Sequence, residues 1–254
     1  MLAAAFALFG LVFGSFLTVV VHRVPRKESI VAPRSRCPGC GTEIRALDNI
    51  PVVSWLALRG RCRVCRTRIS PEYPLTEAAT GALFALAGGL VEPIYAAGVV
   101  AVFLGILLAI ALIDARTRVI PNRITYVTVP LFLAAIGAGH LLDQGTDVLR
   151  GLAGLGLYAI PLFLIALAVP GGMGMGDVKL AALIGLVAGS LGLERVAVSA
   201  GAGVLLGGLG AVVAIAVFGY GRRQHLPFGP FLAAGAAVGV LAGHEIASAY
   251  LSLL

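Results

Sequence analysis

Two aspartates at the edges of apolar segments are the strongest candidates for chemistry in this sequence. Asp114 ends an uncharged apolar run, and Asp177 follows the glycine-rich residues 171–176. A carboxylate at the edge of an apolar membrane segment has a high free-energy cost, which favours a functional role. Two carboxylates can share one proton, so that one acts as base and the other as acid in the hydrolysis of an amide by water. The alternative is that each aspartate marks the end of its segment or pairs with Arg116 or Arg118.

The residues around Asp177 indicate how such a pair would work. Asp177 is expected to open a helix and Asp114 to close one, and helix dipoles then favour charge on Asp177, which we predict to be the ionised partner. Gly174 and Gly176 allow irregular backbone and close approach of an extended substrate. Lys179 lies two residues beyond Asp177, on a different helix face, so no direct ion pair is implied. We expect Lys179 in the same active-site loop, with its ammonium group at the membrane interface.

Four cysteines in two short pairs predict a metal site. Cys37 and Cys40 form one CxxC pair, Cys62 and Cys65 form the other, and 21 residues separate the pairs. Four thiolates at this spacing favour structural zinc, which would fold the segment and leave no open position for catalysis. A disulfide is the alternative, but disulfides are rare in a reducing cytosol. The basic residues nearby would offset the thiolate charge: Arg36, Arg59, Arg61, Arg63, Arg66 and Arg68.

The elements that carry these residues are expected to be membrane helices. Apolar residues make up 59% of the 254 residues and charged residues 12%, against roughly 25% in soluble domains. This composition excludes a disordered chain and an ordinary soluble enzyme. Uncharged apolar runs long enough for helices are 2–21, 93–113, 124–142, 151–176, 196–221 and 226–243. Two weaker segments, 74–90 and 180–193, bring the predicted total to about eight spans in an all-α fold.

The basic residues predict how the chain is oriented. Segment 22–73 holds eleven Arg or Lys against four Asp or Glu, and the rest of the chain holds eight of each. Nucleic acid binding is one interpretation, but beside apolar spans the positive-inside rule explains the excess, and no nucleic acid partner is expected. With the N-terminus outside, the interior loops 22–73, 114–123, 170–179 and 219–225 hold 17 of the 19 basic residues. No signal peptide is indicated, because basic residues follow the first apolar run.

The chain is therefore expected to divide into three parts. Residues 1–21 form the first transmembrane helix, 22–73 a cytoplasmic zinc-binding loop, and 74–254 a seven-helix membrane region carrying both aspartates. Membrane lipid is the expected surrounding of both helical parts. We interpret four further residues first as interfacial: His22, Arg222, Arg223 and His225.

An ordered set of motifs resembles the bacterial type IV prepilin peptidases, which are bifunctional leader peptidases and N-methyltransferases. In the first half of the chain these are Gly14-Ser15-Phe16-Leu17, His22-Arg23-Val24-Pro25, both CxxC pairs, Asn49-Ile50-Pro51, Ser54-Trp55-Leu56, Leu58-Arg59-Gly60-Arg61-Cys62, Ile69-Ser70, Tyr73-Pro74-Leu75 and Glu77. In the second half they are Asp114, Ile120-Pro121-Asn122, Gly176-Asp177-Val178-Lys179-Leu180 and Pro227-Phe228-Gly229-Pro230-Phe231.

The resemblance implies an activity and a location. It implies that Asp114 and Asp177 are the catalytic pair of an aspartic protease, and Gly174-Met175-Gly176-Asp177 fits the GxGD pattern shared with presenilin-like enzymes. The implied substrates are type IV prepilins and type II secretion pseudopilins, cut on the cytoplasmic face of the bacterial inner membrane after a short basic leader. The new N-terminal residue would then be methylated from S-adenosylmethionine.

Some residues depart from the family pattern. Thr18 and Val21 stand where Asn and Ile are common, and Asp48 stands where Glu is common. The last departure concerns methylation, which the large cytoplasmic loop serves in the family. No glycine-rich nucleotide fingerprint locates a binding site for the methyl donor, so its residues stay unassigned.

Two other functions fit parts of the pattern. A different GxGD intramembrane protease would cut inside a helix, and the zinc loop counts against it. An ion-coupled transporter would place carboxylates at the membrane midplane and show an inverted repeat, whereas both aspartates map to the membrane edge. A purely structural assembly subunit would not require the pair of aspartates.

Overall fold

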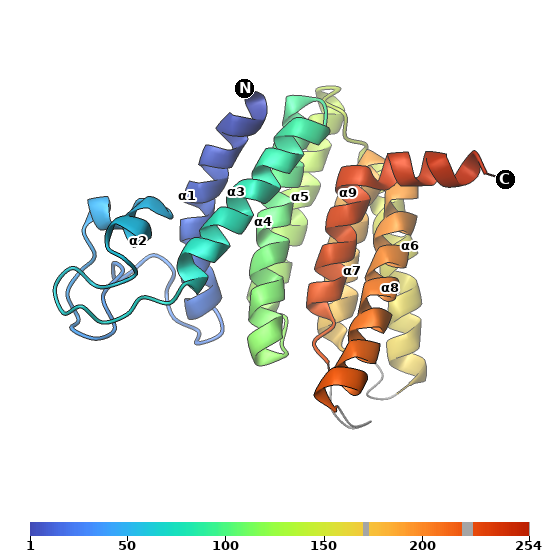
Figure 1. The fold of residues 1–254 in the computed structure, drawn as a ribbon. Helices are drawn as coiled ribbons and strands as arrows, with labels where there is room; N and C mark the ends of the chain where they lie inside the picture. The colour runs from blue at the N-terminus through green and yellow to red at the C-terminus, as the bar shows by residue number, and fades with distance from the viewer. Residues whose placement is uncertain (170–172, 220–225, 254) are drawn as a thin grey trace.

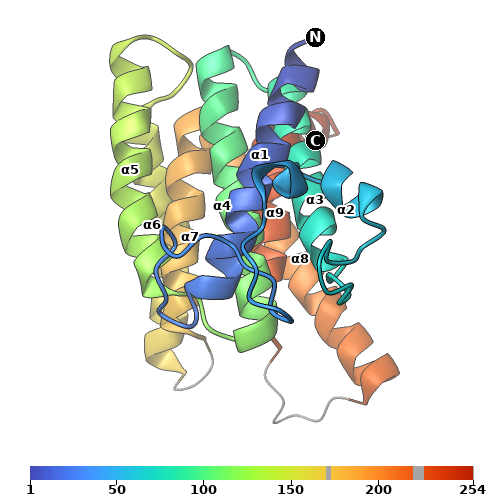
Figure 2. The same ribbon diagram turned by 90° about the vertical axis from the view of Figure 1, so that its left-hand side faces the viewer.

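The expected all-α membrane fold is confirmed by the structure, a computed structural model that describes residues 1–169, 173–219 and 226–253. Long helices run side by side, and the described residues contain no strand (Figures 1 and 2). The segment between the first two long helices holds only the 3₁₀-helix η1 (Ala46–Asn49) and the short α2 (Val53–Ala57). The long helices are α1 (Leu2–Arg23), α3 (Glu72–Leu90), α4 (Ile94–Thr117), α5 (Asn122–Leu141), α6 (Val148–Ala168), α7 (Met175–Leu191), α8 (Leu193–Phe218) and α9 (Gly229–Leu251).

The long helices correspond to the predicted spans, although two are weaker than the rest. By length and composition, α1, α4, α5, α6, α8 and α9 can cross a membrane. The other two are α3, which carries Glu72 and Glu77, and α7, which has 17 residues. These are the segments that the sequence marked as short. Both pack within the bundle, α3 against α1 and α4, and α7 against α5, α6, α8 and α9.

Helix ends near glycine-rich segments differ from the prediction. The expected span 151–176 is wrong at its end, because α6 stops at Ala168. The expected span 180–193 is wrong at its start, since α7 already begins at Met175. The prediction failed because the sequence stays apolar beyond Ala168, so hydropathy alone indicated a longer helix. The glycines that follow disfavour a continuous helix. Three of the residues interpreted as interfacial lie in the next loop, outside the described residues: Arg222, Arg223 and His225. Residues 170–172 also lie outside the described residues.

The last helix is longer than its apolar run. The expected span ended at Gly243, whereas α9 continues through His244 and Glu245 to Leu251. Its C-terminal part turns sharply away from the bundle direction (Figure 1). A helix needs only its backbone hydrogen bonds, so it can continue where the sequence is too polar for the bilayer core.

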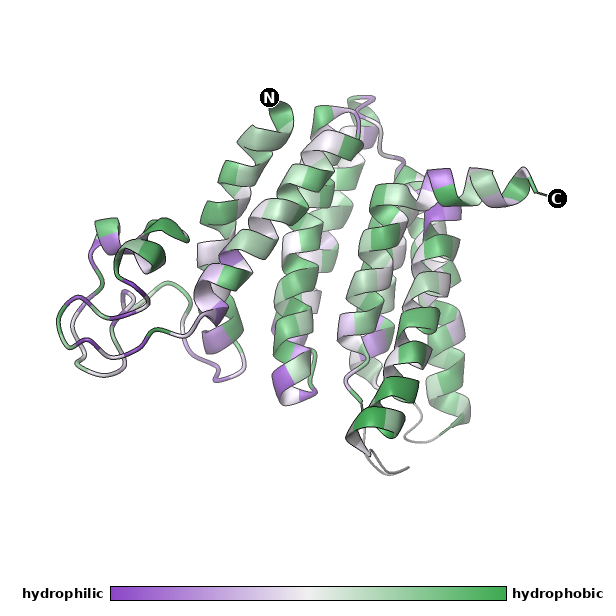
Figure 3. Ribbon diagram, viewed as in Figure 1, coloured by the Kyte–Doolittle hydropathy of each residue, from purple (hydrophilic) through white to green (hydrophobic). Residues whose placement is uncertain are grey.

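Close packing between helices depends on small residues. The nearest partners are α1 with α3, α6 with α7, and α8 with α9, while α4 contacts α1, α3, α5 and α9. Where α6 meets α7, a Cβ added to Gly154 or Gly185 would collide with the backbone of the other helix. Large apolar side chains such as Leu131 and Leu205 stay exposed on the outside, as expected for surfaces that face lipid. Figure 3 shows hydrophobic residues along the helices and hydrophilic ones in the loop and at helix ends.

The alternating direction of the helices brings the candidate residues to one end of the bundle. The end of α4 and the starts of α7 and α9 lie at the lower end in Figure 1. The chain between α1 and α3 leaves and returns at this same end (Figure 2). Arg150 and Arg195, the two basic residues outside the predicted interior loops, begin helices at the other end. The positions of these helix ends agree with the prediction, made from the basic residues, of which loops lie on the same side of the membrane.

Candidate active site

Asp114 lies in the last turn of α4 and is held by the start of α9. Its side chain is buried, with 5% of the residue exposed. Its Oδ2 accepts a hydrogen bond from the backbone N–H of Gly229, the first residue of α9, at 3.0 Å. The first N–H groups of a helix have no partner within the helix, and here one of them is satisfied by a carboxylate. The contact joins two helices that are more than 100 residues apart in the sequence.

Sequence reasoning did not assign a role to Gly229, although the resemblance included it. A Cβ at this position would stand 2.7 Å from Oδ2 of Asp114, closer than real Cβ contacts come. Pro230 follows directly, and proline is favoured in the first turn of a helix. A Gly-Pro pair that opens an apolar helix is therefore the signal that could have shown free N–H groups here.

Gly229→Ala is expected to displace Asp114 and reduce cleavage of the peptide substrate that the resemblance implies by about 10- to 100-fold, because a small misplacement of a reacting group costs about that much. The measurement is the cleavage rate at equal amounts of folded protein. Gly98→Ala in α4 is the matched control, since a Cβ there meets nothing within 4 Å. Equal rates for Gly229→Ala and wild type would contradict this role for Gly229.

Asp177 occupies the third position of α7 and faces the same region. Gly174 caps the helix without a side-chain hydrogen bond, and the Asp177 backbone N–H donates to the Gly174 carbonyl at 3.0 Å. Asp177 is half-buried, and the neighbouring Gly176 packs against Ile120, in the connection that follows the α4 turn carrying Asp114. The structure thus brings together the two carboxylates that the sequence singled out, each at the predicted kind of helix end.

Gly174 and Gly176 both lie where a larger residue would crowd the site. A Cβ on Gly174 would stand 3.1 Å from Oδ2 of Asp177. A Cβ on Gly176 would stand 3.1 Å from Cβ of the buried Ile120, in the connection between α4 and α5. The glycines therefore let the start of α7 lie close to its neighbours, and the Gly174 backbone is exposed beside the carboxylate.

The nearby arginines do not neutralise Asp114 in the described part of the chain. Arg116 instead forms an ion pair with Glu72 at the start of α3. No ion pair joins Asp114 to Arg116 or Arg118. The alternative of a simple interfacial ion pair is therefore not supported. Both aspartates lie at helix ends, which does not match the midplane position that carboxylates of a transporter take.

Lys179 is bound to α5 and not to the aspartates. Its Nζ donates to Oδ1 of Asn122 at 2.8 Å and to the hydroxyl of Tyr126 at 2.9 Å. The same ammonium lies 4.7 Å from the centre of the Tyr126 ring, within reach of a cation–π interaction. These contacts fix the first turn of α7 against α5, so Lys179 holds the backbone that carries Asp177. Asn122 belongs to one of the family motifs, but its hydrogen bond with Lys179 was not predicted from the sequence.

The four cysteines come together as the spacing predicted. Their Sγ atoms all lie within 4.8 Å of one another, and Cys37 and Cys65 are 3.6 Å apart. In a tetrahedral zinc–thiolate site with bonds of about 2.3 Å, sulfur atoms are about 3.8 Å apart. All four are free cysteines, so the disulfide alternative is not supported. The donors and their spacing fit one four-coordinate metal ion.

Each pair of cysteines belongs to a turn of the same construction. The backbone N–H of Cys37 donates to the carbonyl of Thr42, and that of Cys62 donates to Thr67, both at 2.9 Å. The Thr67 hydroxyl, 3.2 Å from Sγ of Cys65, is the main cause that lowers the pKa of this thiol to about 6. A thiolate is the form that binds a metal, so this hydroxyl favours the binding form of Cys65, whereas burial and the neighbouring thiols raise the pKa of Cys37 to about 11.

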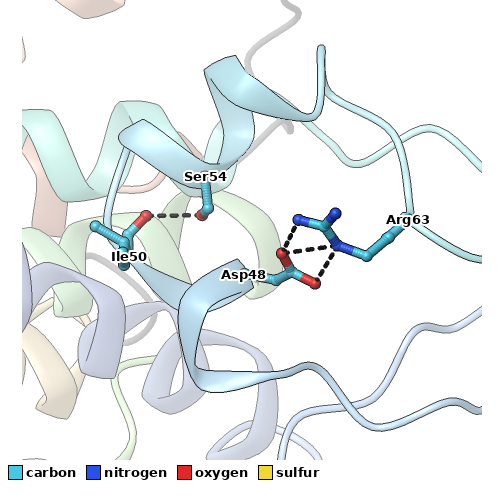
Figure 4. Close-up of polar contacts among 4 residues, drawn as sticks. All are labelled: Asp48, Ile50, Ser54 and Arg63. Atoms are coloured by element: carbon cyan, nitrogen blue, oxygen red, sulfur yellow. Dashed lines mark hydrogen bonds and ion pairs between the residues drawn. The ribbon is translucent and has the colours of Figure 1, made fainter.

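Polar contacts pack the rest of the loop around this cluster. Asp48 in η1 binds Arg63 between the second pair of cysteines, with Oδ1 accepting from Nη2 at 2.6 Å and Oδ2 from Nε at 2.9 Å (Figure 4). The hydrogen bonds from Arg63 lower the pKa of Asp48 below its usual range. The hydroxyl of Ser54 donates to the Ile50 carbonyl at 2.7 Å and fixes the start of α2 (Figure 4). Aspartate at position 48 is thus long enough to reach the cysteine turn.

The comparisons with known proteins agree with these features. Residues 8–89 match the bacterial peptidase A24 N-terminal domain, and residues 101–220 match the type IV leader peptidase family. The chain is 38% identical over 273 residues to a prepilin leader peptidase/N-methyltransferase of Burkholderia pseudomallei strain 1026b, covering 94% of this chain and 85% of that one. It is 37% identical over 249 residues to a protein of that name from Bacillus subtilis strain 168, covering 97% and 96%. No solved structure matches the chain.

Proposed function

The chain belongs to the type IV leader peptidase family, and on this premise we propose that it is a multi-pass inner-membrane enzyme that removes the leader from prepilins and pseudopilins. Asp114 and Asp177 are the catalytic pair in this proposal. The observation that carries it is their meeting at one end of the bundle, on two helices whose ends are fixed by Gly229 and by Lys179. Neither aspartate has a cationic partner among the described residues that would neutralise it.

The pair shares one proton in the resting enzyme. The position of Asp177 at the start of α7 favours charge there, whereas the N–H of Gly229 favours charge on Asp114. These effects oppose each other, so the assignment of the charge to Asp177 stays a prediction. Two coupled acids titrate as a pair, which suits a site where both carboxyl groups exchange roles.

Hydrolysis then follows from the two protonation states. The ionised carboxylate takes a proton from water while the water oxygen bonds to the carbonyl carbon, and the protonated partner donates to the carbonyl oxygen. When the tetrahedral intermediate collapses, the amide nitrogen takes up a proton and the carbon–nitrogen bond breaks. The exposed backbone at Gly174 lies beside Asp177, where an extended leader segment can approach.

The loop between α1 and α3 supplies the second part of the proposed function. Cys37, Cys40, Cys62 and Cys65 hold structural zinc, and the loop faces the cytoplasm with the N-terminus outside. Its fold serves methylation of the new N-terminal residue. S-adenosylmethionine supplies the methyl group: the amine nitrogen bonds to the methyl carbon, the carbon–sulfur bond breaks with its electron pair staying on sulfur, and the nitrogen releases a proton to solvent.

Mass spectrometry of a matched prepilin tests both activities at once. Purified protein in lipid nanodiscs is incubated with the prepilin, with and without S-adenosylmethionine. The proposal expects loss of the leader in both reactions, and the added mass of one methyl group only when the donor is present. An uncut prepilin, or a cut inside its transmembrane helix, would contradict the proposal and favour another intramembrane protease.

A further inference from the structure

A large cavity lies between the cysteine loop and the membrane helices α1 and α3. Its volume is about 1300 Å³, which exceeds the range of roughly 300–1,000 Å³ typical of small-molecule sites. Val12 and Phe16 of α1 line its apolar part, and side chains of the loop line its polar part. Figure 1 shows the loop and α2 on the side of α1 that faces away from α4. The aspartate pair does not line this cavity.

Glu77 of α3 is a buried acid in the wall of this cavity. Only 8% of the residue is exposed. Its Oε2 accepts a hydrogen bond from the backbone N–H of Val52 at 2.7 Å, and its Oε1 has no hydrogen bond to any described residue. No arginine or lysine of the described chain forms an ion pair with it. A buried carboxylate is costly without a positive partner, so this side of the cavity suits a cationic ligand.

Aromatic side chains lie in the same wall. Trp55 lines the cavity and is held in place, because its Nε1 donates to the Ile69 carbonyl at 3.2 Å and its ring covers Gly60. Tyr73 and His22 line it as well, with their ring centres 5.2 Å apart. Aromatic faces favour both flat heterocycles and positively charged ligands. The cavity lining thus combines aromatic rings with a carboxylate that has no cationic partner among the described residues.

We propose that this cavity binds S-adenosylmethionine, with the Glu77 carboxylate facing the sulfonium charge. The inference rests on the methyl transfer assigned under the proposed function and adds the place of binding. The donor has a cationic sulfur and a flat adenine, which match the carboxylate and the aromatic rings. The apolar part along α1 leaves room for the first residue of a membrane-inserted segment to reach the methyl group. Glu77 is a donor-binding residue that also positions α2 through Val52.

The fluorescence of Trp55 provides a direct binding measurement, because Trp55 is the single tryptophan of the chain. Zinc-loaded protein in nanodiscs is titrated with S-adenosylmethionine and, separately, with S-adenosylhomocysteine, which lacks the sulfonium charge. Glu77→Gln keeps an oxygen for the Val52 N–H and removes the negative charge. This variant is expected to weaken S-adenosylmethionine binding by about tenfold or more and S-adenosylhomocysteine binding by less than about threefold.

Glu194→Gln is the matched control, because Glu194 pairs with His244 at the other end of the bundle. It is expected to bind both ligands as the wild type does. Unchanged S-adenosylmethionine affinity in Glu77→Gln would overturn the proposal, and so would equal weakening of both ligands, which would indicate altered loop packing. If the wild type binds neither ligand by fluorescence or calorimetry, the methyl-transfer part of the proposed function fails. If it binds but Glu77→Gln changes nothing, only the site inferred here fails.

Discussion

Asp114→Asn and Asp177→Asn are each expected to reduce prepilin cleavage by about 10³-fold or more, since general acid–base catalysis contributes about 10²–10⁴-fold and the remaining group cannot act alone. Asparagine keeps the shape of aspartate but cannot gain or lose the proton. In Asp114→Asn the side-chain oxygen can still accept from the N–H of Gly229, so the start of α9 is expected to stay in place. The loss would therefore be chemical and not structural.

The measurement compares initial cleavage rates at equal amounts of protein with verified helix content and zinc content. Asp143→Asn is the matched control at the other end of the bundle. The backbone φ of Asp143 is 54°, a left-handed conformation that asparagine also adopts readily. A near-normal rate for either catalytic variant would mean that the chain has the fold of the family without this chemistry.

Cys37→Ser is expected to release the metal and unfold the loop between α1 and α3. Cys37 is the buried member of the four, so a serine there would leave three thiolates around a position with a poor ligand. Structural zinc provides about 10–16 kcal/mol of apparent binding free energy in small zinc domains, and this energy is also folding energy. The loop has few regular elements of its own, only η1 and α2, so its fold is expected to depend on the metal.

Zinc content and amide hydrogen exchange of residues 22–73 measure this effect. The expected result is a metal-free variant with rapid exchange in the loop and unchanged protection in α4. Ala57→Ser introduces a serine on the exposed side of the same segment and is expected to keep the metal. Strong protection of the loop in metal-free Cys37→Ser would show that side-chain packing, such as Asp48 with Arg63, suffices to fold it.

The sequence was enough to predict the parts of the fold that depend on apolar length and on charge. Apolar runs without charged residues predicted the positions of the helices. The basic residues predicted which loops lie at the same end of the bundle. The cysteine cluster was equally accessible, since two CxxC pairs leave few geometries for four thiolates. Asp114 and Asp177 were found because carboxylates at the ends of apolar segments are rare. Their proximity required the order of the helices as well.

Contacts between distant helices were the part that the sequence could not provide. The N–H of Gly229 reaches Asp114 only because α9 packs beside α4, and a backbone donor has no signature of its own. Glu77 appeared in a motif, but its burial beneath Val52 depends on how the loop folds back on α3. The end of α6 was misplaced because apolar residues continue past Ala168, and hydropathy does not distinguish a helix from an apolar connection.

The most direct test of the paired-carboxylate mechanism is the residual cleavage rate of the double variant Asp114→Asn/Asp177→Asn beside the two single variants. If the carboxylates act as one unit, removing the second costs little more, and all three variants retain the same small residual rate. If the two single effects instead multiply in the double variant, each aspartate contributes independently, and the account of a shared proton and a paired mechanism is contradicted.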